Sequence, residues 1–141
     1  MKISTKGRYA LKIIIDLAEH QKDEFIPLRD IALRQEISEK YLESIIKILV
    51  KHKMLIGLRG KGGGYKLTKN PDSYTVAEIL KVSEESIAQV EGFETEADSK
   101  NLSAYRTIEM WNKLNALIDE YLSGITIADL ICEDPGNDYV I

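Results

Sequence analysis

The chain has 141 residues, of which 44% are apolar and 30% charged, and this composition is that of a globular protein with one folded domain. No apolar run approaches the ~20 residues of a bilayer-spanning helix, and the start of the sequence lacks the apolar stretch of a secretory signal. We therefore expect a cytoplasmic protein without membrane contact. One cysteine and two histidines are too few for an internal disulfide or a Cys/His zinc site, so no metal site is predicted.

The net charge of −4 is unevenly distributed along the chain. Residues 1–70 contain 15 Lys and Arg against 8 Asp and Glu, a net charge of +7, whereas residues 71–141 contain 4 against 15, a net charge of −11. Binding to a polyanion depends on clustered cations rather than on a high overall charge, so the basic first half favours a polyanion partner. The alternative is that these cations form only a solvated face of the protein.

Apolar residues at three- and four-residue steps predict three helices in the first half of the chain. The first begins at Ser4 or Thr5 and ends near His20, the second covers about 28–35, and the third follows Ser38, a residue type that caps helices. A tight link joins the last two helices, and the third carries lysines on its polar side. This is the arrangement of a helix-turn-helix.

A hairpin with a glycine-rich tip is predicted next, from strands over 54–59 and 65–68. The tip, GKGGG at 60–64, matches neither phosphate-binding motif, because both continue into a helix where a strand follows here. A plain structural turn and a wing that lies along DNA remain as interpretations. The cations Arg59 and Lys61 favour the wing, since guanidinium groups enter minor grooves readily.

The second half is predicted to contain a closing helix over 75–82 and a long apolar helix over about 101–122, with a short helix over 126–131 after it. The long helix carries more large apolar residues than so small a chain can bury, so it is expected to pair with a second copy. The predicted interface residues are Ile108, Trp111, Leu114, Ile118 and Tyr121. The predicted domains are a DNA-binding unit over 1–82, an acidic loop over 83–99, and a dimerisation helix with a polar tail over 100–141.

Catalysis has little support in the sequence, so we do not expect an enzyme. No G-x-S-x-G motif is present, and Cys132 has no basic residue near it in the sequence that would make it a nucleophile. His20 and His52 each fall at the end of a predicted helix among lysines, where a solvated or capping role is favoured over metal binding.

Three segments carry a family resemblance: MKISTKGRYA at 1–10, ISEKYLE at 37–43 and RGKGGGY at 59–65. Together they resemble the Rrf2 family of bacterial winged helix-turn-helix transcription regulators, strongly over about 1–82 and in element order to about 131. The resemblance implies a mainly α fold with a small β-hairpin wing and a long dimerisation helix. It also implies a homodimer that binds a two-fold related DNA operator, and we expect such a dimer to act as a repressor.

The resemblance assigns DNA contacts to three parts of the chain: the start of the first helix, the third helix and the wing. The third helix enters the major groove, where Glu43 can accept a hydrogen bond from a cytosine amino group and Lys40 or Lys47 suits phosphate. The wing reaches the adjacent minor groove. The residues carried over by position are Lys2, Lys6, Arg8, Ser38, Lys40, Tyr41, Glu43, Ser44, Lys47, Arg59, Lys61, Gly62 and Gly63.

The sequence departs from the family pattern in its cysteines. Cluster-binding members carry three cysteines just before the long helix, whereas residues 83–107 contain none, and Gly92, Asp98 and Ala104 stand near those positions. An iron-sulfur cluster held by thiolates is therefore not expected, nor any other cofactor. The resemblance to cluster-free members implies that a metabolite or a protein co-regulator sets DNA affinity. Cys132 is interpreted as a small buried hydrophobe or, as the alternative, a redox sensor.

One function of another class stays open on these observations. A winged-helix scaffold can bind a protein instead of a specific DNA sequence, because a fold does not by itself determine a function. Salt dependence of duplex binding distinguishes the two hypotheses, since only phosphate neutralisation makes affinity fall steeply with salt.

Overall fold

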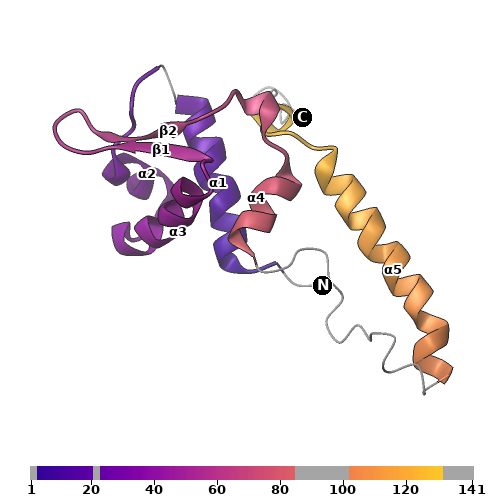
Figure 1. Cartoon of the computed structure of the whole chain (residues 1–141). Helices are drawn as coiled ribbons and strands as arrows, with labels where there is room; N and C mark the ends of the chain where they lie inside the picture. The colour runs from indigo at the N-terminus through magenta and orange to yellow at the C-terminus, as the bar shows by residue number, and fades with distance from the viewer. Residues whose placement is uncertain (1–2, 21–22, 85–101, 132–141) are drawn as a thin grey trace, which may run out of the picture.

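The computed structural model of the protein describes residues 3–20, 23–84 and 102–131 (Figure 1). Lys2, most of the predicted acidic loop with Gly92 and Asp98, and Cys132 with the polar tail lie outside the described residues. The elements follow the order α1, α2, α3, β1, β2, η1, α4, α5 and α6. This confirms the predicted mainly α fold with a small hairpin, and Figure 1 shows the hairpin at one end and α5 at the other.

Helices α1 (Thr5–His20), α2 (Leu28–Gln35) and α3 (Glu39–Lys51) form where the apolar periodicity predicts them. The Ser38 side chain caps α3 by accepting a hydrogen bond from a backbone N–H of the first turn. After α2, Glu36 adopts a left-handed backbone conformation with a φ of 52°, and its N–H bonds to the last turn of α2. The link between the two helices is therefore short, and it holds α3 against α2.

Strands β1 (Leu55–Leu58) and β2 (Gly64–Leu67) pair antiparallel, with the first residue of β1 opposite the last residue of β2. Ile26, just before α2, makes two backbone hydrogen bonds of 2.9 and 2.8 Å with Tyr65 of β2. Gly64 lies so close to the Ile26 carbonyl that any side chain on Gly64 would overlap it. The hairpin is thus fastened along β2, while its turn projects away from the body (Figure 1).

The remaining elements are η1 (Pro71–Ser73), a single 3-10 turn, and the helices α4 (Val76–Ser83), α5 (Leu102–Ser123) and α6 (Ile127–Ile131). Helices α4 and α6 both begin with a capping box, formed by Thr75 with Glu78 and by Thr126 with Asp129. Thr75 and Thr126 also face each other in an antiparallel bridge. The two helix starts therefore lie side by side, and α6 packs against α1 and η1.

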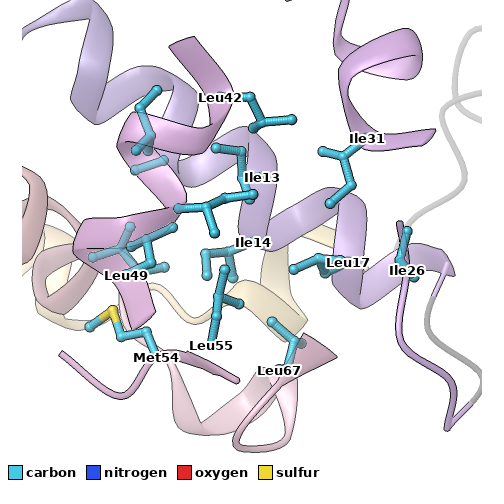
Figure 2. Close-up of a cluster of buried hydrophobic side chains, with 14 of the residues drawn as sticks. Ile13, Ile14, Leu17, Ile26, Ile31, Leu42, Leu49, Met54, Leu55 and Leu67 are labelled. Carbon is cyan, nitrogen blue, oxygen red and sulfur yellow. The ribbon is translucent and has the colours of Figure 1, made fainter. Parts of the chain in front are cut away.

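The hydrophobic core lies between α1, α3 and the hairpin (Figure 2). Ile14 and Leu17 of α1 lie near its centre, and Leu42 and Leu49 come from α3; all four side chains are fully buried. Ile127 of α6 is fully buried in the same cluster. Because α6 follows the long helix, the chain returns to its first core after α5, a contact that the sequence did not predict.

Candidate nucleic-acid interface

Helix α3 presents a mainly polar face to solvent because most of its large apolar residues face the core. Leu42, Ile45, Ile46 and Leu49 are buried at three- and four-residue spacing, which leaves the opposite side of the helix free. The exposed side carries four of the residues predicted to contact DNA, namely Lys40, Glu43, Ser44 and Lys47. Among these, the Glu43 and Lys47 side chains lie 3.9 Å apart as an exposed ion pair.

Tyr41 links the start of α3 to α1. Its ring meets the Tyr9 ring edge to face, with centroids 5.9 Å apart, and the Lys12 ammonium lies 5.1 Å from the centre of the Tyr9 ring. The Ser44 hydroxyl donates a 2.6 Å hydrogen bond to the Tyr41 carbonyl, and the Ser38 hydroxyl caps the helix. The two serine hydroxyls are therefore already bonded to their own helix, and the tyrosine pair joins the polar surfaces of α1 and α3.

Lys12 is an interface candidate that the sequence analysis missed. Its side chain is exposed, and it stands one helical turn after Arg8 on α1, beside the Tyr9–Tyr41 pair. Arg8 is exposed as well, and Lys6 is half-buried. The four-residue spacing from Arg8 to Lys12 is the signal that would have placed both cations on one helix face.

The glycines of the wing divide into two kinds. Gly60 and Gly62 have positive φ angles of 95° and 79°, and a Cβ atom on either would meet open space. Gly63 is different, because a side chain there would overlap the carbonyl of Leu58. Closing the turn therefore requires Gly63, whereas the other two bend an exposed tip. Arg59 and Lys61 are both exposed at this tip.

An open groove of about 700 Å³ lies between α3 and the wing. Glu43 and Lys47 line one side, Arg59 and Gly63 line the other, and Leu28 at the start of α2 also contributes. The predicted contact residues of α3 and of the wing tip thus face one groove, although β1 separates the two segments in the sequence. An extended polyanion that follows this groove would meet side chains of both elements.

A buried carboxylate fixes the helix-turn-helix to α1. Asp16 is 2% exposed, and it accepts hydrogen bonds of 2.7 and 3.0 Å from the Arg34 guanidinium and one of 2.9 Å from the Gln35 side chain. The hydrogen bonds to Asp16 are the main cause that raises the pKa of Arg34, with Coulomb attraction adding to it. The Arg34 side chain is partly exposed, but its guanidinium is paired with Asp16, so Arg34 is not a candidate for DNA contact.

A second carboxylate occupies the start of α1. Glu84, just after α4, accepts hydrogen bonds from the Ser4 backbone N–H at 2.8 Å and from the Ser4 hydroxyl at 2.5 Å. A side chain on Gly7 would overlap this carboxylate, which explains a buried glycine in the first turn. Glu84 was expected in an acidic loop, because no local residue pattern indicates a contact across 80 positions.

Helix α5 leaves much of its apolar surface uncovered within one chain. Of the predicted interface residues, Leu114 and Tyr121 are exposed, whereas Ile108, Trp111 and Ile118 are half-buried. The exposed apolar residues also include Leu102, Tyr105, Met110 and Leu117, which belong to the predicted apolar helix but were not among the predicted interface residues. No helix in the described ranges, α5 with its 22 residues included, has both the length and the apolar character to cross a membrane.

The described residues include no cluster of three or more His, Cys, Asp or Glu side chains with the geometry to hold a metal ion. Each histidine ring makes a local bond at a helix end. The Nδ1 atom of His20 lies 2.8 Å from the Asp16 carbonyl, and that of His52 lies 3.0 Å from the Ile48 carbonyl. Both carbonyls belong to the preceding helical turn, so these contacts fit the predicted capping role.

The helix-turn-helix, the wing and the groove between them define a winged helix-turn-helix protein, the class to which many DNA-binding regulators belong. Residues 3–133 match the model of the Rrf2 family, described as iron-dependent transcriptional regulators, and the chain belongs to this family. It is a DNA-binding transcriptional regulator and not an enzyme.

The chain is similar along most of its length to individual members of the family. It is 37% identical to the regulator CymR of Bacillus subtilis over 130 aligned residues. The alignment covers 92% of this chain and 89% of CymR. The structure of B. subtilis CymR, the global cysteine regulator, matches with a TM-score of 0.79 at 36% identity, over 95% of this chain and 99% of that one. The structure of T. potens IscR matches with a TM-score of 0.77 at 33% identity, over 100% and 93%.

Proposed function

We propose that this regulator is a homodimeric, sequence-specific repressor that binds a two-fold related DNA operator without an iron-sulfur cluster, in the cytoplasm. The observation that carries the proposal is the groove between α3 and the wing, which brings Lys47 and Arg59 to one open surface. A B-DNA major groove is about 12 Å wide and admits one α-helix, so α3 enters it while the wing follows the neighbouring backbone.

Each contact surface has a distinct role in this proposal. Lys6 and Arg8 at the start of α1 bind phosphate, as does Lys2 before it, and Lys12 extends their row. On α3, Ser38, Lys40, Tyr41 and Ser44 lie near the helix start and position it on the backbone. At the wing tip, Arg59 and Lys61 reach the minor groove and the phosphates that line it, and the small residues Gly62 and Gly63 let the protein backbone come close.

Glu43 is the proposed base-reading residue of α3. A carboxylate accepts hydrogen bonds only, so in the major groove it pairs with the amino group of cytosine and disfavours a bare acceptor. The ion pair with Lys47 at 3.9 Å holds the two side chains on one line of the helix. When DNA binds, this ion pair opens: the Lys47 side chain contacts a phosphate and the Glu43 side chain contacts a base.

The homodimer is proposed from the exposed apolar surface of α5. The proposed domains are a DNA-binding unit over 1–82, a loop over 83–99 that connects the two other parts, and the dimerisation helix with the tail over 100–141. Leu114, Leu117 and Tyr121 are exposed and lie at three- and four-residue steps, as a helix-helix seam requires. A two-fold pairing of α5 with its copy covers this surface and places two copies of α3 at successive turns of DNA.

The absence of a cluster is proposed from the ligand supply. The family description names iron, yet Cys132 is the single cysteine of this sequence. A dimer then offers two thiolates, whereas iron-sulfur clusters usually take about four protein ligands. A small metabolite or a protein co-regulator is therefore proposed to set DNA affinity.

A selection of bound duplexes from a random pool tests the function. Enrichment of a sequence with two related half-sites, bound more tightly than its scrambled version, is the expected result. A pool without enrichment, at low as well as at moderate salt, contradicts specific DNA binding and favours a protein-binding role of the same scaffold.

A further inference from the structure

Tyr74 is fully buried, and its hydroxyl is the most heavily bonded side-chain group near the wing. It donates a 2.7 Å hydrogen bond to the Met54 carbonyl and accepts bonds from the N–H groups of Thr68 at 2.9 Å and Lys69 at 3.2 Å. The Thr68 hydroxyl oxygen lies 3.2 Å from the Tyr74 hydroxyl oxygen. A buried hydroxyl with these three bonds is a fixed point in the structure, because the hydroxyl itself is out of reach of water when its bonds break.

These partners are the two ends of the wing. Met54 directly precedes β1, and Thr68 with Lys69 directly follows β2. The Thr68 hydroxyl also donates a 2.7 Å hydrogen bond to the Lys53 carbonyl, at the exit from α3. The Tyr74 phenol thus joins the start of the first strand of the wing to the end of the last strand, and the Thr68 hydroxyl adds a bond to the exit from α3.

The main chain of Tyr74 is itself anchored, so its hydroxyl cannot drift with the wing. The Tyr74 carbonyl accepts a 3.0 Å hydrogen bond from the N–H of Ile127, and the N–H of Val76 donates a 2.9 Å bond to the Ile125 carbonyl. These two bonds form the bridge between the starts of α4 and α6. The Tyr74 ring therefore extends from a backbone segment that is hydrogen-bonded to the start of α6 and reaches the two ends of the wing.

A small rotation at this base produces a large displacement at the wing tip. A strand rises about 3.3 Å per residue, so Arg59 lies about 17 Å along the wing from Met54, and a 10° rotation moves it by about 3 Å. A charge-assisted hydrogen bond is itself about 2.8 Å long, so this displacement is enough to lose a phosphate contact.

We propose that Tyr74 is a positioning residue for DNA binding, whose hydroxyl sets the angle between the wing and α3. This role rests on the proposed DNA binding by α3 and the wing, and it adds a residue that touches no DNA itself. With the hydroxyl in place, Arg59 and Lys61 meet the backbone when α3 lies in the major groove. Without the Tyr74 hydroxyl, the two ends of the wing are held less firmly, and the position of the wing tip relative to α3 is no longer fixed.

The test uses Tyr74→Phe in the full chain, because phenylalanine keeps the buried ring and removes only the hydroxyl. Affinity for the selected duplex is expected to fall about ten-fold, since each protomer loses a well-placed wing contact. In the free protein, amide hydrogen exchange is expected to accelerate at Thr68, Lys69 and the strands, about ten-fold, with little change in α1. Ile79→Val, buried in α4 away from the wing base, is the control for a general loss of stability.

A double-mutant cycle with Arg59→Ala separates positioning from plain stability. In the parent, Arg59→Ala weakens binding; in the Tyr74→Phe background it is expected to cost much less, because the wing contact is already lost. Equal costs in both backgrounds, or an Ile79→Val variant that weakens binding as much as Tyr74→Phe, overturn the positioning role alone. A parent protein that binds no duplex overturns the proposed function, and this role with it.

Discussion

Helices α3 and α5 are both amphipathic, but they distribute their apolar residues in opposite ways. Leu42, Ile45 and Leu49 of α3 are fully buried, and its outer face is polar. On α5, by contrast, Leu117 is 53% exposed and Tyr121 is 70% exposed. An outer face that is polar and basic fits a hydrated polyanion, whereas an outer face that is apolar fits another apolar surface. We therefore propose different partners for the two helices, DNA for α3 and a second copy of the chain for α5.

The largest effect is expected from charges on the outer face of α5. Replacing Leu114 and Leu117 together by Glu places charge in the proposed seam, so the protein becomes monomeric and its operator affinity falls by more than about 100-fold because only one half-site is engaged. Sedimentation and duplex binding measure the two effects. Ile118 is left unchanged, because it is half-buried and a charge there would disturb the fold.

The matched control for the seam is Leu33→Glu on α2, since Leu33 is exposed to 72% but lies outside α5. This variant is expected to keep the parent's sedimentation behaviour. Circular dichroism establishes that both variants are folded. A Leu114/Leu117 double variant that is folded and still dimeric would show that the outer face of α5 is not the dimer interface, and it would contradict the proposed difference between α3 and α5.

Asp16→Ala tests how α2, and with it the helix-turn-helix, is held against α1. The substitution leaves Arg34 and Gln35 without their shared acceptor, and we expect a loss of about 2–4 kcal/mol in the free energy of unfolding, less than for a fully buried pair because Arg34 can reach water. Urea denaturation measures it. Glu19→Ala, an exposed carboxylate on the same helix, is the control and is expected to change stability by less than about 0.5 kcal/mol. A stability loss no larger than that of the control would contradict the role of this ion pair.

Arg59→Ala and Glu43→Ala are expected to weaken DNA binding in different ways, each by about 1–3 kcal/mol. The wing variant should lose affinity and its preference for A·T-rich flanks, because minor-groove width attracts arginine. The α3 variant should relax discrimination at one base position and keep its salt dependence. Competition with single-base variants of the selected duplex measures both. Two variants that discriminate between duplexes as the parent does would remove these residues from the interface.

Exposure to air and substitution of Cys132 are expected to have the smallest effect on DNA binding. Protein purified without oxygen from iron-supplied cells should be colourless between about 320 and 450 nm, because too few thiolates are present for a cluster. Its DNA binding should be equal before and after exposure to air, and Cys132→Ser should leave it unchanged. A brown protein with bound iron, or binding lost on oxidation and retained in Cys132→Ser, would contradict the cofactor-free proposal.

Local signals predicted the elements of this fold well. The cap at Ser38, the three- and four-residue spacing of Leu42 to Leu49, and the glycines between two short apolar strands are all readable within about ten residues. The helices and the hairpin follow from these patterns to within a residue or two of their predicted ends. The wing beside α3 follows as well, because a hairpin that directly follows a helix cannot move far from it.

Contacts between distant segments were not predictable in the same way. Glu84 caps α1 from 80 positions away, Ile127 completes a core built mostly by the first half, and the Tyr74 hydroxyl joins both ends of the wing. Each depends on how finished elements pack, and no local residue pattern distinguishes Tyr74 from an ordinary core tyrosine. The sequence also could not divide the apolar residues of α5 into half-buried and exposed ones, since both sets recur at helical spacing.

The salt dependence of binding to the selected duplex tests the contrast between α3 and α5 most directly. Seven described cations of each protomer are proposed to lie near phosphate, namely Lys6, Arg8, Lys12, Lys40, Lys47, Arg59 and Lys61. If half of those in a dimer contact phosphate, log K falls with log[salt] at a slope of about −6, because each neutralised phosphate contributes about −0.9. A slope near that value is the predicted result. A slope near zero on a duplex that the protein binds specifically would contradict the account, because the basic face of α3 and the wing would then not be the surface that meets DNA.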